Sequence, residues 1–172
     1  MLKLNLGCGF NLLAGWENHD EDVDLRLRPL PWRDGSVQFI LLEHVLEHFN
    51  CAIGYSILEE CFRILAPGGV LRVCVPDVTQ VARADPSYVE FLKRHGWPES
   101  PVKALATQHG HEMLYTAETL SIILQSIGFA PERAKPHVSS HPELCNVEGH
   151  HKIIGRKFNE LETLVVEGMK TR

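Results

Sequence analysis

Three alternating leucines followed at once by two glycines constrain the fold of this chain more than any other feature. Leu2, Leu4 and Leu6 alternate with polar residues, which is the period of a β-strand with one buried face. Gly7 and Gly9 follow directly, and glycine lacks the Cβ atom that keeps a backbone away from a ligand. The pattern predicts a first strand that ends in a tight turn, with or without a ligand.

Further hydrophobic patterns alternate between strands and helices. Apolar residues recur at helical spacing from Ile53 to Leu65, and again between an N-cap at Thr116 and a stop at Gly128. Residues 78–115 are predicted to be a helical insertion over the sheet edge. Further predicted strands are residues 16–20, 37–42, 70–75, 133–138 and 163–167. This alternation predicts a Rossmann-like α/β fold with three α/β/α layers and a mostly parallel sheet, in one domain spanning residues 1–172.

The first connections are too short for ordinary crossover helices. Residues 23–27 also have strand character, yet very few residues separate them from the strand predicted at 16–20. A crossover between parallel strands usually takes roughly a dozen residues or more. Either the N-terminal crossover helices have shortened to single turns, or one of these segments is not a strand.

Composition limits the classes of partner. Hydrophobic residues make up 44% and charged residues 23% of the 172 residues, which is typical of a globular protein. The formal net charge of -5 provides no basic footprint for nucleic acid or an anionic membrane. No apolar run approaches the roughly 20 residues of a membrane span. We expect a small-molecule substrate, with no nucleic acid and no membrane as partner.

Cysteine usage indicates the compartment. The five cysteines include no C-x-x-C pair, and an odd number argues against a disulfide framework. The N-terminus has no apolar stretch typical of a secretory signal. We expect a cytoplasmic protein, and a homodimer is possible because a trimmed domain can cover an exposed sheet edge with a second copy.

Polar side chains follow several predicted strands. Asp20 ends residues 16–20, where dinucleotide-type folds place a carboxylate that binds ribose hydroxyls. Its alternative is a solvated acid in an acidic run of three residues. Glu43 and His44 follow another strand, and Asp77 follows the next. Ligands of open α/β sheets bind at the carboxyl ends of strands, so these residues are site candidates.

The chain resembles the class I S-adenosylmethionine-dependent methyltransferases, in their small-domain branch. No segment carries the resemblance alone, but order and spacing match over most of the chain. The matching segments are residues 4–11, 15–20, 30–36, 44–48, 63–77, 110–115 and 140–144.

The resemblance implies a cofactor and a division of roles. It implies S-adenosylmethionine as cofactor and a small-molecule or sugar-type acceptor. The implied catalytic residues are His44 or His111 as base, with Asp77 or Tyr115 positioning the acceptor. The implied cofactor-binding residues are Gly7, Cys8, Gly9, Asn11, Asp20 and Glu43.

Two positions depart from the family pattern. Arg26 stands where the family often has an aspartate that contacts the adenine amino group, and Gln38 replaces a second usual aspartate. The helix that usually precedes the first strand has no counterpart here. These departures leave open a catalytically inactive, methyltransferase-like binding protein.

Ten histidines invite metal hypotheses. His44, Glu47 and His48 match the H-x-x-E-H pattern of zinc peptidases, in which two histidines on one helical face hold the metal. A zinc-dependent hydrolase is therefore a further alternative, with Glu112 or Glu118 as third ligand. No pair has cysteines at ligand spacing, so we expect no metal site. His109 and His111 are better candidates for substrate contact than His150 and His151, which we expect to be solvated.

Overall fold

A computed structural model describes residues 1–84, 86–97, 100–107 and 110–171. Within these residues, one sheet has the strand order β2-β1-β3-β4-β6-β5. The strands are β1 (Leu2–Leu6), β2 (Glu17–His19), β3 (Val37–Glu43), β4 (Leu65–Pro76), β5 (Phe129–Ala134) and β6 (Thr163–Lys170). The helices are α1 (Cys51–Ile64), α2 (Val78–Ala82), α3 (Pro86–Arg94), α4 (Pro101–Thr107), α5 (Ala117–Ile127), α6 (His151–Ile154) and α7 (Arg156–Glu162), with 3-10 turns η1 (Leu46–His48) and η2 (Pro142–Leu144).

The sheet is mostly parallel, as predicted. Strand β1 pairs in parallel with β2 and β3, and β3 pairs in parallel with β4, whereas β6 runs antiparallel to β4 and β5. The register aligns Leu6 with both His19 and Leu42, and Glu43 with Cys74. The carboxyl ends of β1, β2, β3 and β4 therefore lie at one edge of the sheet, where ligands of such folds bind.

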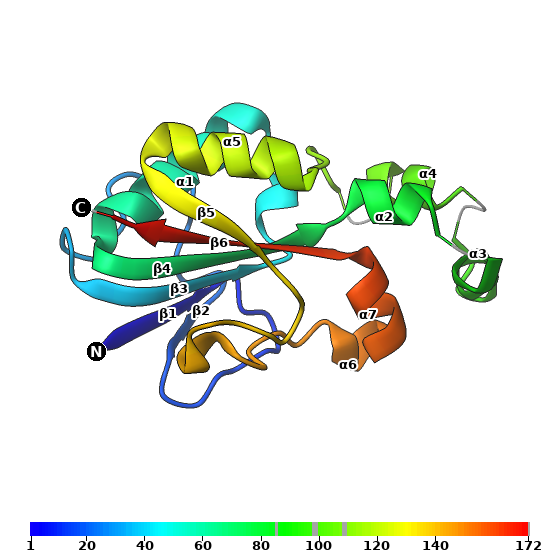
Figure 1. The fold of residues 1–172 in the computed structure, drawn as a ribbon, viewed down its shortest axis with the longest axis horizontal. Coiled ribbons are helices and arrows are strands. Elements are labelled where there is room, and N and C mark those ends of the chain that lie inside the picture. The colour runs from blue at the N-terminus through cyan, green and yellow to red at the C-terminus, as the bar shows by residue number, and fades with distance from the viewer. Residues whose placement is uncertain (85, 98–99, 108–109, 172) are drawn as a thin grey trace.

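Helices α1 and α5 cover one face of the sheet (Figure 1). In α1, Ile57, Leu58, Cys61 and Ile64 are buried at helical spacing against strand residues such as Leu42. The helix begins at its N-cap Asn50, whose side chain accepts a hydrogen bond from the Ile53 amide. The predicted Thr116 cap of α5 and its end at Gly128 are both confirmed.

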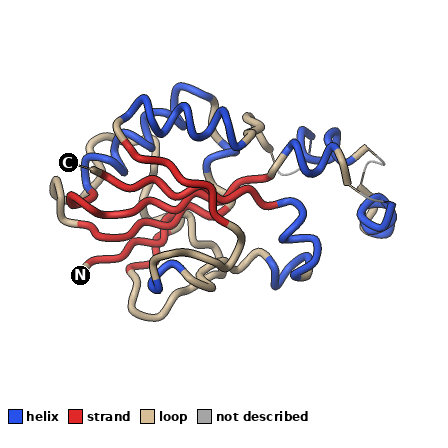
Figure 2. Tube along the Cα trace, viewed as in Figure 1, coloured by secondary structure: helices blue, strands red, loops and turns tan. Residues whose placement is uncertain are grey.

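Loops and the short turn η2 cover the opposite face (Figure 2). Leu13, Trp16 and Val147 pack on Leu41 and Cys74 of the sheet. The third layer of the expected α/β/α arrangement is thus built from loops. This agrees with the shortened crossovers: residues 23–27 form turns, so the strand considered there is wrong, and the connection from β2 to β3 contains no regular helix.

The predicted helical insertion contains α2, α3 and α4, which project beyond the carboxyl edge of the sheet (Figure 1). These helices have an apolar cluster of their own, formed by Val81, Tyr88, Leu92, Ala104 and Leu105. Phe158 and Leu161 of α7 pack against it. The insertion and the segment before β6 together form one wall beside the strand ends.

Two predicted boundaries are wrong. Strand β5 starts at Phe129 because the chain turns into the sheet directly after Gly128, whose φ is 118°. Strand β4 starts at Leu65 instead of residue 70, and Pro67 to Gly69 form an irregular start where the register with β3 shifts. A Cβ on Gly69 would lie 2.8 Å from the Ala66 carbonyl oxygen, so this tight turn requires glycine.

No helix among the described residues is both long and apolar enough to span a membrane. All five cysteines are free thiols.

Candidate functional site

The glycine turn after β1 is open to a ligand on one side. Gly7 and Gly9 have φ values of 68° and 47°, which glycine adopts without strain. A Cβ on Gly7 would lie 2.4 Å from a methyl group of Val45, so the turn packs tightly there. A Cβ on Gly9 would meet no atom within 4 Å. The backbone at Gly9 therefore faces free space in which a ligand can approach it.

Asp20 lies beside this turn, as predicted. It directly follows β2, and its exposed side chain lines a hollow of about 430 Å³ together with Gly7. Asp24 and Arg26 line the same hollow. The Arg26 guanidinium is held by its neighbour, because Nε and Nη2 donate to the Asp24 carboxylate at 2.8 and 2.9 Å.

Glu43 and Asn11 join the glycine turn to a loop more than a hundred residues away. The Glu43 carboxylate accepts hydrogen bonds from the Asn11 side-chain amide at 3.0 Å and from the backbone amides of Gly149 and His150 at 2.8 and 2.9 Å. Asn11 also donates to the Val147 carbonyl at 2.8 Å. These side chains line a second hollow of about 270 Å³, but most of their hydrogen-bonding capacity is used within the protein.

A third cavity lies between His44 and the helices of the insertion. It has a volume of about 440 Å³, and Tyr88, Leu92, Trp97 and Leu105 of the insertion form an apolar wall. Its polar lining consists of His44, Glu47, His48, His111, His150 and Glu162. An apolar wall with a few convergent polar groups is typical of a site for a small molecule.

His44 lines all three hollows. Its backbone has a left-handed φ of 52°, which is uncommon outside glycine and often marks a functional position. Its Nδ1 lies 3.0 Å from Oε1 of the buried Glu47, and its ring packs on His150 with centroids 4.1 Å apart. Its Nε2 is buried and has no hydrogen-bond partner among the described residues.

Neighbouring groups shift the pKa values of His44 and Glu162. Burial alone would lower the pKa of His44, but the hydrogen bond and charge of Glu47, together with the charges of Glu43 and Glu162, raise it above its ordinary value. Burial alone would raise the pKa of Glu162, but hydrogen bonds from His150 and Tyr88 lower it. The surrounding carboxylates therefore make His44 more basic than an isolated imidazole, and the hydrogen bonds to Glu162 favour its ionised form.

The structure separates the predicted catalytic residues. His44 and His111 line the same cavity, whereas Asp77 lines a different hollow with Thr116. Oδ1 of Asp77 caps α2, and Oδ2 accepts a hydrogen bond from Arg133. Tyr115 is buried in the main core, and burial raises its pKa to about 12. His109 lies outside the described residues.

His150 is the site residue that sequence reasoning missed. The expectation that it is solvated is wrong. Its backbone amide donates a hydrogen bond to the Glu43 carboxylate, and its Nε2 lies 2.8 Å from Oε1 of Glu162. Its partner His151 also packs on a protein ring, that of His137. No local pattern marks these contacts, because the partners are far away in the chain.

The alternative zinc-peptidase arrangement, with His44 and His48 on one helical face, is not present. His44 precedes the turn η1, which is three residues long, so His44 and His48 do not share a helical face.

Gln38 lies near the start of β3, at the opposite edge of the sheet, and donates to the Gly68 carbonyl. Its departure from the family pattern therefore does not affect the site.

Residues 11–73 match a family model described as a methyltransferase domain. The match spans 63 of the 172 residues and supports the class I S-adenosylmethionine-dependent methyltransferase family. The match covers the strand before Asp20 and the segment with His44. The insertion and the loop of His150, which complete the apolar cavity, lie beyond the matched residues.

Solved methyltransferase structures share the fold. An S-adenosylmethionine-dependent methyltransferase from Archaeoglobus fulgidus aligns with a TM-score of 0.62 at 14% identity, over 98% of this chain and 85% of that one. A possible histamine N-methyltransferase from Thermotoga maritima aligns with 0.55 at 17%, over 98% and 82%. A putative methyltransferase from Haloferax volcanii, solved with its Trm112 activator, aligns with 0.54 at 11%, over 99% and 83%. No curated protein matches the sequence.

Proposed function

We propose that this methyltransferase transfers the methyl group of S-adenosylmethionine to a small molecule bound in the cavity of about 440 Å³. One observation carries the proposal. The hollows beside the glycine turn and the apolar cavity meet at His44, so a cofactor on one side and an acceptor on the other would touch at this residue.

The residues present fit the cofactor. The free space at Gly9 admits a ligand to the backbone of the turn, and the exposed Asp20 carboxylate offers hydrogen-bond acceptors to ribose hydroxyls. The backbone from Gly7 to Gly9, with the side chain of Asn11, would hold the methionine part, while Glu43 positions Asn11. When bound, S-adenosylmethionine supplies an electrophilic methyl group on a positively charged sulfur.

The chain itself contributes alignment and a base. Methyl transfer requires the acceptor atom about 3–3.5 Å from the methyl carbon, so most of the catalysis lies in positioning. A hydroxyl acceptor must also lose its proton. Nε2 of His44 would accept that proton, because Glu47 holds Nδ1 and Nε2 has no partner among the described residues.

The cavity indicates the class of acceptor. The side chains of Tyr88, Leu92, Trp97 and Leu105 would bury an apolar body, while the histidines would face a hydroxyl or amine. We therefore favour an apolar small molecule over a sugar. The free cysteines support a reducing compartment such as the cytoplasm.

Calorimetric titration tests the cofactor, and transfer of a radiolabelled methyl group tests the reaction. S-adenosylmethionine and its demethylated product should both bind the full chain, and a panel of apolar hydroxyl and amine compounds should then contain an acceptor. Absence of heat at millimolar ligand would end the proposal. Cofactor binding without transfer to any compound would favour the inactive binding protein instead.

A further inference from the structure

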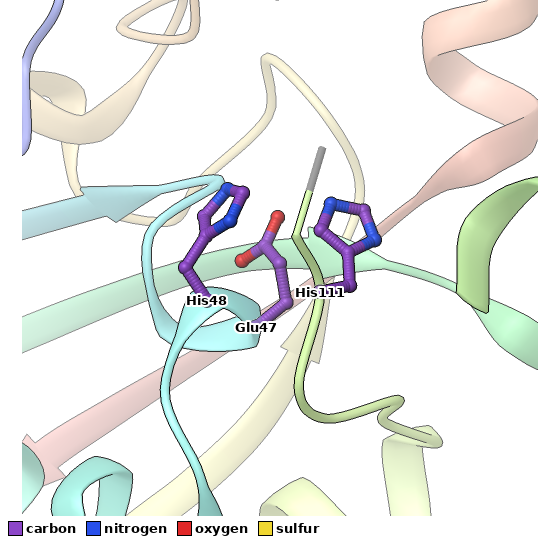
Figure 3. A group of neighbouring side chains, drawn as sticks. All are labelled: Glu47, His48 and His111. Carbon is purple, nitrogen blue, oxygen red and sulfur yellow. The ribbon is translucent and has the colours of Figure 1, made fainter. Parts of the chain in front are cut away.

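Three potential metal ligands meet in the wall of the acceptor cavity. Glu47, His48 and His111 each offer a ligand atom, and these atoms all lie within 4.8 Å of one another. Figure 3 shows the Glu47 carboxylate between the two imidazole rings. All three side chains line the cavity assigned above to the acceptor.

The Glu47 carboxylate is incompletely satisfied. The side chain is fully buried, and its Oε1 lies 3.0 Å from His44 Nδ1. Its Oε2 is also buried but has no hydrogen-bond partner among the described residues. A buried carboxylate oxygen without a partner is costly, and a bound cation would remove that cost. This orphaned atom is independent evidence for a ligand at the cluster.

The backbone holds the three residues in place without a metal. Glu47 and His48 are consecutive in η1, and His111 approaches from a neighbouring segment (Figure 3). The backbone carbonyl of Glu47 accepts hydrogen bonds from the amides of Glu112 and Met113 at 2.8 and 3.1 Å. These bonds fix the segment of His111 against the turn, so the cluster is preorganised.

His111 has the outer contact that metal-binding histidines usually have. Its Nδ1 lies 2.7 Å from the Leu105 carbonyl oxygen, so Nδ1 carries the proton and donates it. In this neutral tautomer Nε2 carries the lone pair that a metal requires. A hydrogen bond from the other ring nitrogen to a carbonyl is the common way in which proteins orient a histidine ligand.

We propose that Glu47, His48 and His111 bind a divalent first-row transition-metal ion such as Zn²⁺ or Co²⁺. Two imidazoles and one carboxylate suit such ions better than Mg²⁺ or Ca²⁺, which prefer oxygen ligands. Three protein ligands leave at least one coordination position open toward the cavity.

The open position defines the acceptor more closely, a step that rests on the proposed methyl transfer. An acceptor that reaches the ion must have an oxygen or nitrogen atom able to coordinate it. A hydroxyl coordinated in this way loses its proton more readily. The acceptor class is therefore an apolar molecule with a metal-coordinating hydroxyl or amine. His48 also lines the cofactor-side hollow, which places the ion near the boundary between the two ligands.

Metal titration of the chelator-stripped full chain tests the site. Zn²⁺ should bind with one ion per chain by calorimetry, and Co²⁺ should give the visible absorption of a low-coordinate histidine site. His48→Ala and His111→Ala should each weaken binding by at least about tenfold. His95→Ala is the matched control, because His95 is exposed on the insertion and bonds the Phe91 carbonyl.

The outcomes separate this inference from the proposed function. If S-adenosylmethionine binds but neither Zn²⁺ nor Co²⁺ binds, the metal site is wrong and methyl transfer stands. If metal binds but the cofactor does not, the metal site stands and methyl transfer fails. Binding of Zn²⁺ that both histidine variants retain would also overturn the site, provided that circular dichroism shows both variants folded.

Discussion

The proposed cofactor side and the proposed acceptor side of the cleft are built differently. On the cofactor side, Gly9 and Asp20 lie within a few residues of strand ends, and their positions follow from the adjacent strands β1 and β2. On the acceptor side, His44, His111 and His150 come from segments far apart in the chain and meet through buried contacts. A local turn thus suffices for the proposed cofactor site, whereas the proposed acceptor site forms only in the completed fold.

The difference indicates which side determines specificity. A turn after a strand provides backbone groups and one carboxylate, which suit a cofactor common to many enzymes. A cavity with walls from an insertion and a distant loop can change shape without disturbing the sheet. We therefore expect variants on the acceptor side to alter stability and acceptor choice, and variants of exposed side chains on the cofactor side to act mainly on cofactor affinity.

The largest effect is expected at Arg72, which holds the loop leading to His150. Its fully buried guanidinium donates to the carboxylates of Glu148 and Glu167 and to the Lys135 carbonyl. Arg72→Met leaves both carboxylates buried without a cation and should destabilise the protein by roughly 3–5 kcal/mol. Urea unfolding measures the loss.

Arg83→Met provides the comparison for Arg72, because Arg83 is exposed and its replacement should change stability by less than about 0.5 kcal/mol. Equal stability of the Arg72 and Arg83 variants would show that the loop does not depend on this buried network.

Asp20 provides the sharpest test of the cofactor side. Asp20→Ala removes the carboxylate beside Gly7 and should weaken S-adenosylmethionine binding more than tenfold, while the melting temperature stays unchanged because the side chain is exposed. Calorimetry measures the affinity. Glu132→Ala, on an exposed position of β5, should leave it unchanged. An unaltered affinity in Asp20→Ala would remove the assigned ribose contact.

Glu60 of α1 anchors the connection between β2 and β3, whose first residues line the hollow beside Asp20. It accepts hydrogen bonds from Arg63 and from the Leu30 amide at 2.8 Å. Glu60→Gln should cost about 1 kcal/mol at neutral pH. The hydrogen bond from Arg63 lowers the pKa of Glu60 below its usual 4.5, so its stabilisation is complete above that value and is lost as the pH falls through the folded-state pKa.

Unfolding measured from pH 7 to pH 3 should therefore show the gap between wild type and Glu60→Gln narrowing in acid. A gap that stays constant across this range would show that the charge of Glu60 contributes nothing.

The smallest effect is expected at Arg26. Because its guanidinium is paired with Asp24 and exposed, Arg26→Ala should leave the melting temperature unchanged and alter cofactor affinity by less than about threefold. A more than tenfold gain in affinity by calorimetry would instead show that the guanidinium occupies space needed by the cofactor.

Sequence reasoning succeeded where a signal is local. The strand before Gly7, the cap at Thr116 and the place of Asp20 after a short strand were all predicted and are present. It failed at the start of β4, because the bulge at Pro67 to Gly69 depends on the neighbouring strand. It also failed at His150, because its hydrogen-bond partners Glu43 and Glu162 lie at other positions of the chain.

The amino-acid sequence by itself determined the α/β class, the glycine turn and the carboxylate beside it. These follow from the period of apolar residues and from the backbone freedom of glycine, which act over a few residues. Tertiary structure alone decided that His44, Glu47, His48, His111 and His150 share one cavity. Their meeting depends on how strands, insertion and loop pack together, and no short-range pattern encodes contacts between segments so far apart.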